Sequence, residues 1–167
     1  MAEIKKEKKE KARKPKIKVI FVCTGNTCRS PMAENIFKQL LASKRKLSSF
    51  DVSSAGLSAE EGAPMTDNAI KALATLGVKV RRKHKAKQLT LVAAQNADYI
   101  VCMTSAHARA LAGLGEKTFS VAEITAGPEV SDPYGGDLNV YLNTAEHLEY
   151  AAQVLYQFIC DREKQTI

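Results

Sequence analysis

Cysteine, glycine and arginine stand close together in the stretch FVCTGNTCRSPMAE, residues 21–34. Cys23 lies six positions before Arg29, and Gly25 between them permits backbone conformations that residues with a Cβ avoid. Successive amides in such a turn can point inward and form a concave nest for phosphate. A thiolate at the base of that nest, opposite a guanidinium, is suited to attack phosphorus. The spacing therefore predicts phosphoryl-transfer chemistry, with Cys23 as nucleophile and Arg29 binding the phosphate oxygens.

Each part of this stretch is a weak signal when it is taken alone. A cysteine often ends a buried strand, and turns that contain glycine often precede helices. Arg29 is more informative, because a cation at a helix N-terminus opposes the helix dipole unless an anion compensates it. A nucleotide P-loop is disfavoured, since the stretch lacks the Gly-Lys-[Ser/Thr] ending. The combination favours a catalytic phosphate-binding turn over a purely structural one.

Four strands are predicted to alternate with helices along the chain. Apolar runs rich in β-branched residues predict strands at residues 17–23, 50–56, 98–104 and 117–124. Helical spacing predicts helices over 64–77, 105–115 and 138–160, a short helix within 83–97, and a first helix with Ser30 as N-cap and Pro31 as first residue. This alternation indicates an α/β fold. We expect a single domain with a central four-stranded parallel sheet, helices on both faces, and the phosphate-binding loop after the first strand.

The composition is that of a globular domain. The 167 residues are 45% hydrophobic and 26% charged, which fits one domain with a sizeable core. No apolar run approaches the roughly 18 residues that a membrane span requires. The lysine-rich N-terminus lacks the apolar stretch of a signal peptide, so we expect a cytoplasmic protein.

Most of the net charge of +7 belongs to the N-terminus. Residues 1–18 carry nine Lys or Arg and three Glu, a balance of +6, which leaves about +1 for the rest. We therefore predict a disordered basic extension over residues 1–16 and a folded catalytic domain over residues 17–167. Binding of the extension to nucleic acid or anionic lipid is the alternative, but it has no aromatic residue to stack on a base. The predicted chemistry requires no nucleic acid.

The four cysteines do not indicate a metal site or a disulfide framework. They form no CxxC pairs and the three histidines are scattered, so no zinc site is predicted. Cys102 lies in an apolar run and Cys160 late in a helical pattern, and both are interpreted as core residues. No metal or organic cofactor is expected, because amides and Arg29 can handle the charge of a phosphate group.

The sequence resembles the low-molecular-weight protein tyrosine phosphatases, which are small α/β proteins with such a loop near the N-terminus. The likeness extends from about residue 17 to residue 160. It rests on five motifs: VCTGNTCRSPMAE (22–34), SSAG (53–56), HKAKQL (84–89), ADYIVCMT (97–104) and DPYGG (132–136). The first and last of these are highly specific.

The resemblance implies roles for single residues. These are the nucleophile Cys23, the phosphate clamp Arg29, the hydrogen-bond partner of the thiolate Ser30, and the general acid Asp132. The last role also has an independent physical basis, because one carboxyl on a covering loop can protonate the leaving atom and later deprotonate a water. Without the cysteine loop, the stretch around Asp132 would be read as only a turn. Tyr134 would form a wall of the pocket, against the alternative of an exposed turn residue.

The resemblance also implies a pocket and a supporting network. The loop residues that would contact the phosphate are Thr24, Gly25, Asn26, Thr27, Cys28 and Ser30. Asn26, Ser54 and His84 fall where the family has a buried polar network that holds the loop, although His84 could equally be an exposed loop residue. Cys28 would capture an oxidised Cys23 as a disulfide and so prevent irreversible oxidation. The alternative for Cys28 is a small packing residue.

Two departures from the tyrosine-specific pattern bear on the substrate. Thr24 and Thr27 stand where those enzymes often carry aliphatic side chains. The hydroxyl of Thr27 suits a polar, planar guanidinium better than a phenyl ring. Phosphatases that act on phosphoarginine resemble this chain in that threonine and in a glycine pair, here Gly135 and Gly136, after the aromatic of the acid loop. We predict hydrolysis of phosphoarginine in proteins through a phosphocysteine intermediate, with phosphotyrosine as the alternative.

Two other classes are kept as less favoured alternatives. An arsenate reductase can use the same fold and loop, but it needs further cysteines as a relay, and Cys102 and Cys160 look badly placed. A non-catalytic phosphoprotein-binding module needs only the nest and Arg29, so the presence of both Cys23 and Asp132 argues against it. Phosphorylated proteins are the expected partners, and the expected state is a monomer or weak dimer.

Overall fold

A four-stranded parallel sheet forms the centre of the molecule. The computed structural model describes residues 13–165. Its strands lie in the order β2-β1-β3-β4 and all three neighbouring pairs are parallel. Their bounds are Ile17–Cys23 for β1, Phe50–Gly56 for β2, Tyr99–Cys102 for β3 and Thr118–Ser120 for β4. The predicted α/β fold with four parallel strands is confirmed.

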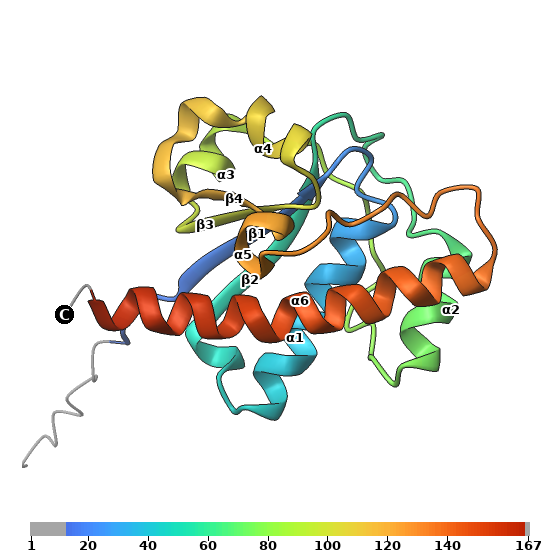
Figure 1. The fold of residues 1–167 in the computed structure, drawn as a ribbon, viewed down its shortest axis with the longest axis horizontal. Helices are drawn as coiled ribbons and strands as arrows, with labels where there is room; N and C mark the ends of the chain where they lie inside the picture. The colour runs from blue at the N-terminus through green and yellow to red at the C-terminus, as the bar shows by residue number, and fades with distance from the viewer. Residues whose placement is uncertain (1–12, 166–167) are drawn as a thin grey trace, which may run out of the picture.

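Helices cover both faces of this sheet (Figure 1). Their bounds are Arg29–Ser43 for α1, Asp67–Thr75 for α2, Leu91–Asn96 for α3, Ser105–Ala110 for α4, Val121–Thr125 for α5 and Leu138–Gln165 for α6, with 3₁₀ turns at Leu47–Ser49 and Ala112–Lys117. Helix α6 runs along the long axis of the molecule, and α3 and α4 lie across the sheet from it. Within residues 13–165, none of the helices combines the length and apolar composition that a membrane crossing needs.

The alternation of side chains along β1 divides the core into two clusters. Val19 and Phe21 point into the larger one, which they share with residues of α1, α2 and α6. Ile20 and Val22 point the opposite way, into a smaller cluster with residues of α3 and β3. Because strand side chains alternate with a period of two, Cys23 falls on the same face as Val19 and Phe21. The last residue of β1 therefore faces α1, where the phosphate-binding turn leads.

The predicted strand over 117–124 is wrong in its second half. The strand ends at Ser120, and helix α5 begins with the next residue. Ser120 Oγ accepts a hydrogen bond from the Glu123 amide at 3.1 Å, and Glu123 Oε2 accepts one from the Ser120 amide at 2.7 Å. This capping box satisfies two amides at the start of α5, so the segment turns into a helix.

The predicted start of the first helix is also displaced. Helix α1 begins at Arg29 with Cys28 as N-cap and no side-chain cap, so Ser30 is not the capping residue. Other bounds change as well: α2 is shorter than 64–77, α4 gives way to a 3₁₀ turn after Ala110, β3 is shorter than 98–104, and α6 continues past residue 160. Most of the predicted basic extension, residues 1–12, lies outside the described residues.

Candidate active site

Residues 23–30 form a tight turn from the end of β1 into α1. Asn26 has a left-handed backbone with φ of 56°. Gly25 has no positive φ, and a Cβ there would meet only Thr27 Oγ1 at 3.7 Å. The turn therefore places its left-handed residue at Asn26, which tolerates that conformation, and the conformational argument for Gly25 is wrong.

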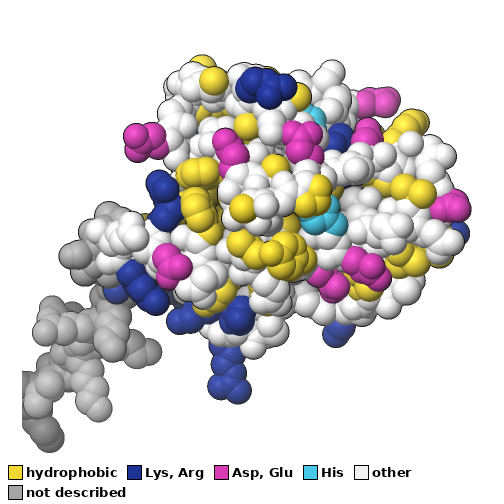
Figure 2. Space-filling model, in the orientation of Figure 1, with side chains coloured by type: hydrophobic (Ala, Val, Ile, Leu, Met, Phe, Trp, Pro, Cys, Tyr) yellow, Lys and Arg dark blue, Asp and Glu magenta, His cyan; other side chains and the backbone are white. Residues whose placement is uncertain are grey.

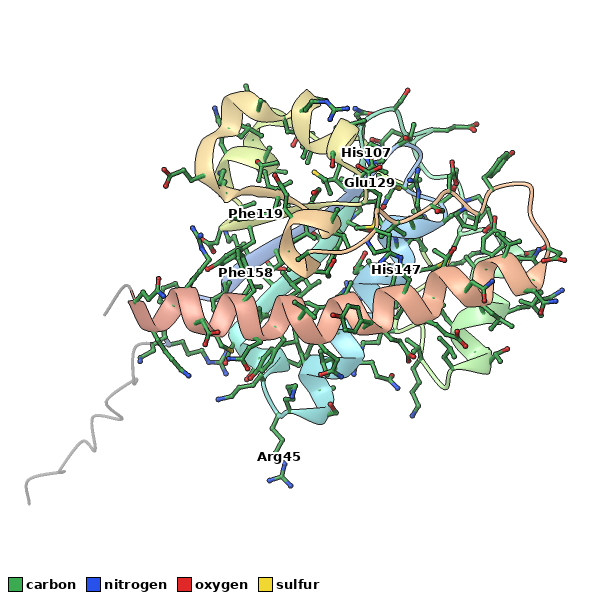
Figure 3. All side chains as sticks on the ribbon, viewed as in Figure 1. Arg45, His107, Phe119, Glu129, His147 and Phe158 are labelled. Atoms are coloured by element: carbon green, nitrogen blue, oxygen red, sulfur yellow. The ribbon has the colours of Figure 1, made fainter. Side chains whose placement is uncertain are left out.

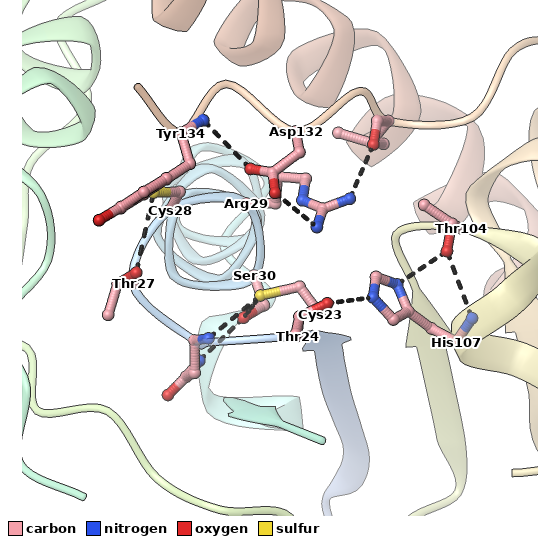
Figure 4. A network of polar contacts seen from close by, with 12 residues as sticks. Cys23, Thr24, Thr27, Cys28, Arg29, Ser30, Thr104, His107, Asp132 and Tyr134 are labelled. Atoms are coloured by element: carbon pink, nitrogen blue, oxygen red, sulfur yellow. Dashed lines mark hydrogen bonds and ion pairs between the residues drawn. The ribbon is translucent and has the colours of Figure 1, made fainter. Parts of the chain in front are cut away.

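Cys23 is buried at the base of the turn. Its Sγ lies 2.9 Å from Ser30 Oγ, and the Asn26 amide donates to it at 3.3 Å (Figure 4). Ser30 does not cap helix α1, and its hydroxyl contacts the sulfur atom instead. These contacts hold the Cys23 sulfur atom at the base of the turn.

Asn26 connects the turn to the rest of the protein. Its Nδ2 donates to Ser30 Oγ at 2.8 Å and to Ser54 Oγ at 3.0 Å, and its Oδ1 accepts from the Lys87 amide at 2.9 Å. Its carbonyl oxygen lies 2.6 Å from His84 Nε2. The structure therefore brings together Asn26, Ser54 and His84, the three residues that the resemblance placed in one network.

Gly56, at the end of β2, is a residue that the sequence reasoning missed. A Cβ there would lie 2.5 Å from the carbonyl oxygen of Thr24 and 3.2 Å from Asn26 Cβ. Contacts below 3.0 Å require the backbone to shift. Because Gly56, the glycine of the SSAG motif, has no side chain, β2 can pack closely against the phosphate-binding turn.

Arg29 joins the turn to the loop that carries Asp132. Its Nη1 donates to the Val130 carbonyl at 3.1 Å, and its Nη2 lies 3.5 Å from Asp132 Oδ2. Arg29 is buried, whereas the Asp132 side chain is 57% exposed. The Tyr134 amide donates to Asp132 Oδ1 at 3.1 Å, which fixes the direction of the carboxylate. The acid loop thus lies over the phosphate-binding turn, as Figure 4 shows.

A cysteine, an arginine and a carboxylate are thereby assembled around an amide-lined turn. A sequence model of the low molecular weight phosphotyrosine protein phosphatases matches residues 18–165. The chain belongs to this family.

Relatives within the family are named either as arginine phosphatases or as protein tyrosine phosphatases. The protein-arginine-phosphatase of Bacillus subtilis is 36% identical over 78% of this chain and 89% of the relative. The solved low molecular weight protein tyrosine phosphatase from T. tengcongensis is 37% identical over 84% of this chain and 98% of that one, with a TM-score of 0.78. A mutant of the arginine phosphatase YwlE, solved with a phosphorylated active-site serine, is 34% identical over 86% and 95%, with a TM-score of 0.77. The present chain is a cysteine-dependent protein phosphatase, and phosphorylated proteins are its substrates.

His107 is a second residue of the phosphatase site that the sequence reasoning missed. Its Nε2 lies 2.9 Å from Thr24 Oγ1 of the turn, and its Nδ1 lies 3.0 Å from Thr104 Oγ1. Burial lowers its pKa, the charge of Arg29 lowers it further, and Glu129 and Asp132 act in the opposite direction. Glu129 lies beside it (Figure 3) and accepts from the Ser105 amide at 2.7 Å. The sequence did offer one indication of His107. It lies three residues after Thr104, the N-cap of α4, and α4 follows the carboxyl end of β3, which faces the site.

Cys28 lies in the turn but makes different contacts from Cys23. Its Sγ lies 3.4 Å from both Thr66 Oγ1 and Tyr141 OH. Burial and the contact with Cys28 raise the pKa of Tyr141 to about 12. Cys28 is thus packed between the start of α2 and α6, and it is a free thiol in this structure.

Cys102 is separated from the site by the sheet itself. It belongs to the cluster formed with α3, on the face opposite to that of Cys23. Burial raises its pKa to about 12, which makes it a poor nucleophile. This placement argues against Cys102 as a relay thiol of an arsenate reductase.

Proposed function

We propose that this phosphatase hydrolyses phosphoarginine in proteins, with Cys23 as nucleophile, Arg29 as phosphate clamp and Asp132 as acid and base. The observation that carries the mechanism is the position of Cys23 Sγ, which receives hydrogen-bond contacts from Ser30 and Asn26 beneath a buried arginine. No other thiol among residues 13–165 has such surroundings.

In the first step, the thiolate of Cys23 attacks phosphorus and the bond from phosphorus to the guanidino nitrogen breaks. Asp132 gives its proton to that nitrogen, so arginine leaves as a neutral group that then takes up a proton from water. The negative charge of the phosphoryl oxygens is stabilised by Arg29 and the inward-facing amides. The distance of 3.5 Å between Asp132 Oδ2 and Arg29 Nη2 supports this role, because the acid would then lie next to the group that binds phosphate.

In the second step, Asp132 removes a proton from a water that attacks the phosphocysteine. Inorganic phosphate forms and the Cys23 thiolate is released. The loop residues proposed to hold the phosphate through both steps are Thr24, Gly25, Asn26, Thr27, Cys28 and Ser30. Ser54 and His84 would hold Asn26 in its left-handed conformation, since both contact it directly.

Thr27 supports phosphoarginine over phosphotyrosine. It is half-buried in the turn, its carbonyl accepts from the Thr66 amide at 3.0 Å, and its Oγ1 lies 3.8 Å from Cys28 Sγ. This hydroxyl can accept a hydrogen bond from a guanidinium, which a tyrosine ring would not offer. Tyr134, 75% exposed, is placed to form an outer wall that stacks on a planar group.

The glycine pair after Tyr134 is weaker support for the substrate. Gly135 has φ of 78°, and a Cβ on Gly136 would lie 2.9 Å from the Pro133 carbonyl oxygen. Both glycines are therefore required by the shape of the acid loop. They would be needed whatever the substrate is, so the substrate proposal rests on Thr27.

The test compares kcat/KM on a phosphoarginine protein and on a phosphotyrosine peptide. The wild type should prefer phosphoarginine, and Thr27→Ile should reduce that preference by about tenfold or more, the value of one good hydrogen bond to a charged group. Cys23→Ser should abolish turnover of both substrates. A wild-type preference for phosphotyrosine would refute the substrate and leave the mechanism, whereas full activity of Cys23→Ser would refute the mechanism.

Residues 17–167 are proposed to be the complete catalytic unit, active in the cytoplasm without nucleic acid and as a monomer or weak dimer. The basic extension, residues 1–16, would then be dispensable for chemistry. A chain that begins at residue 17 should keep kcat/KM within about twofold of the full chain, and a larger loss would contradict this proposal.

Cys28 is proposed as the redox partner of Cys23. A peroxide would oxidise the Cys23 thiolate to sulfenic acid, and the Cys28 thiol would attack that sulfur and expel water, so that an S–S bond forms. Peroxide treatment should remove two hydrogens from the intact mass and reversibly inactivate the enzyme. In Cys28→Ala the mass should instead rise by added oxygen.

A further inference from the structure

A basic slot lies between β2 and the segment that precedes α3. It encloses about 640 Å³, with the residues of β2 on one side and the RRKHKAK segment, residues 81–87, on the other. Its basic lining, apart from Lys38 and His84, consists of Lys16, Arg81, Arg82, Lys83, Lys85 and Lys87. The proposed phosphatase mechanism uses none of these six side chains.

The positive charge of the basic slot is not compensated within the structure. Its lining has two carboxylates, Glu34 and Asp51. Glu34 already binds Lys38 at 2.6 Å and accepts from Ser54 at 2.6 Å. No carboxylate among residues 13–165 pairs with any of the six basic residues. Acidic and basic side chains are interspersed over the face shown in Figure 2, so a lining in which basic side chains outnumber carboxylates this strongly is not the general condition of the surface.

The edge of β2 contributes backbone groups to the basic slot. β2 ends the sheet, and only β1 pairs with it as a neighbouring strand. The Gly56 amide donates to the Lys87 carbonyl oxygen at 2.8 Å, and the Gly56 carbonyl oxygen accepts from the Leu89 amide at 2.8 Å. Both backbone groups of Gly56 therefore point to the outer edge of β2. Because alternate residues of a strand share this direction, the backbone groups of Val52 and Ser54 also point outward. Within residues 13–165 they have no backbone partner on that side.

We propose that the basic slot binds an acidic, extended segment of a partner protein, which adds to the sheet along the free edge of β2. Strand addition supplies main-chain hydrogen bonds, and charge complementarity selects an acidic sequence. The N-terminus of the chain itself is an unsuitable occupant, because residues 1–18 carry nine basic and three acidic residues. This binding goes beyond the proposed hydrolysis and does not depend on it.

The basic slot also touches the network that holds the phosphate-binding turn. Its lining includes His84, which contacts the Asn26 carbonyl, and Lys87, whose amide donates to Asn26 Oδ1. A bound segment would therefore rest against residues that position the catalytic turn. The slot is placed to bring a protein partner to the phosphatase without occupying its active site.

The experiment measures binding of a fluorescent ten-residue peptide of alternating Glu and Val by anisotropy at physiological ionic strength. Arg81→Glu/Lys83→Glu should weaken binding at least tenfold. Arg45→Glu/Lys71→Glu changes the charge equally at exposed residues that do not line the slot, and should stay within about twofold. Arg45 extends away from the body of the protein in Figure 3. Equal losses in both variants would overturn the proposal.

Two further probes separate strand addition from simple attraction of polyanions. A peptide of the same sequence with an N-methyl group on every residue keeps its charge but cannot donate main-chain hydrogen bonds to β2 from either edge, and should bind at least tenfold more weakly. If it binds equally well, or if single-stranded DNA of equal charge competes as strongly as the peptide, the slot binds polyanions in general and the proposal is wrong. Hydrolysis of a small aryl phosphate should be unchanged in the slot variants, which separates this result from any failure of the proposed catalytic roles.

Discussion

The phosphate-binding turn and the acid loop are the two halves of the proposed active site, and they are held in opposite ways. In the turn, Cys23, Asn26 and Ser30 are at most 3% exposed, and Asn26 alone makes contacts to two other segments, β2 and residues 81–87. In the acid loop, the side chains of Asp132 and Tyr134 face solvent. Among residues 13–165, Arg29 is the side chain that links the two halves directly.

This difference follows from the two tasks. Amides and a guanidinium stabilise a developing charge best when they are fixed before the reaction, because no free energy is then spent on orienting them. A proton donor must instead reach the leaving atom of a bulky protein substrate and later a water molecule. Burial suits the first task and exposure suits the second.

The largest expected effect comes from removing the acid while the turn stays intact. Asp132→Asn should lower kcat about 10²- to 10⁴-fold, the usual contribution of a positioned acid or base. The turn should keep its affinity for phosphate, because Asn retains the shape of the side chain and the nest is unchanged. Single-turnover kinetics and phosphate inhibition measure the two quantities.

A parallel loss of phosphate affinity in Asp132→Asn would contradict the division of tasks. It would mean that the ion pair with Arg29 organises the phosphate-binding turn as well. A substrate with a leaving group that needs no proton, such as a dinitrophenyl phosphate, provides the control for the first step. Its rate of dinitrophenol release in the pre-steady-state burst should fall much less, whereas hydrolysis of the phosphocysteine still lacks its base.

An intermediate effect is expected from a substitution at the end of β2, where the strand packs against the phosphate-binding turn. Gly56→Ala would place a Cβ 2.5 Å from the Thr24 carbonyl oxygen, so the backbone of β2 or of the turn must move. Overpacking of this kind costs about 1–3 kcal/mol in the free energy of unfolding. Chemical denaturation measures this loss, and kcat/KM should fall with it.

Gly113→Ala is the matched control, because a Cβ at that glycine would meet nothing within 4 Å and no positive φ is involved. It should leave stability and activity nearly unchanged. Equal behaviour of the two variants would show that β2 does not constrain the phosphate-binding turn.

The same contrast explains what the sequence could predict. Cys23, Arg29 and Asp132 could be predicted as site residues because their residue types, spacing and motifs are local in the chain. Gly56 and His107 were missed because their importance arises from contacts over long sequence separations, a carbonyl of the turn in one case and Thr24 in the other. The strand over 117–124 failed for a related reason, since its apolar pattern outweighed the capping box of Ser120 and Glu123.

The smallest expected effect concerns pH and His107, which connects the turn to the neighbourhood of the acid loop. Burial and Arg29 lower its pKa in the folded protein below the ordinary value of about 6.5. The unfolded chain therefore binds more protons below that pH, so the stabilisation is present above pH 6.5 and is lost as pH falls towards the folded pKa. His107→Gln should reduce the slope of unfolding free energy against pH between about pH 7 and 5.5, by at most about 1.4 kcal/mol per pH unit.

His147 provides the comparison for this measurement. Burial lowers its pKa too, but it lies on α6 and is not hydrogen-bonded to the turn. Denaturation at several pH values should show a reduced slope of unfolding free energy against pH in both His107→Gln and His147→Gln. Only His107→Gln should change kcat/KM, because His107 contacts Thr24 and His147 does not. If His107→Gln altered the slope and left kcat/KM at the wild-type value, its contact with the turn would serve stability alone, and the positioning of the turn would rest on Asn26 and Gly56.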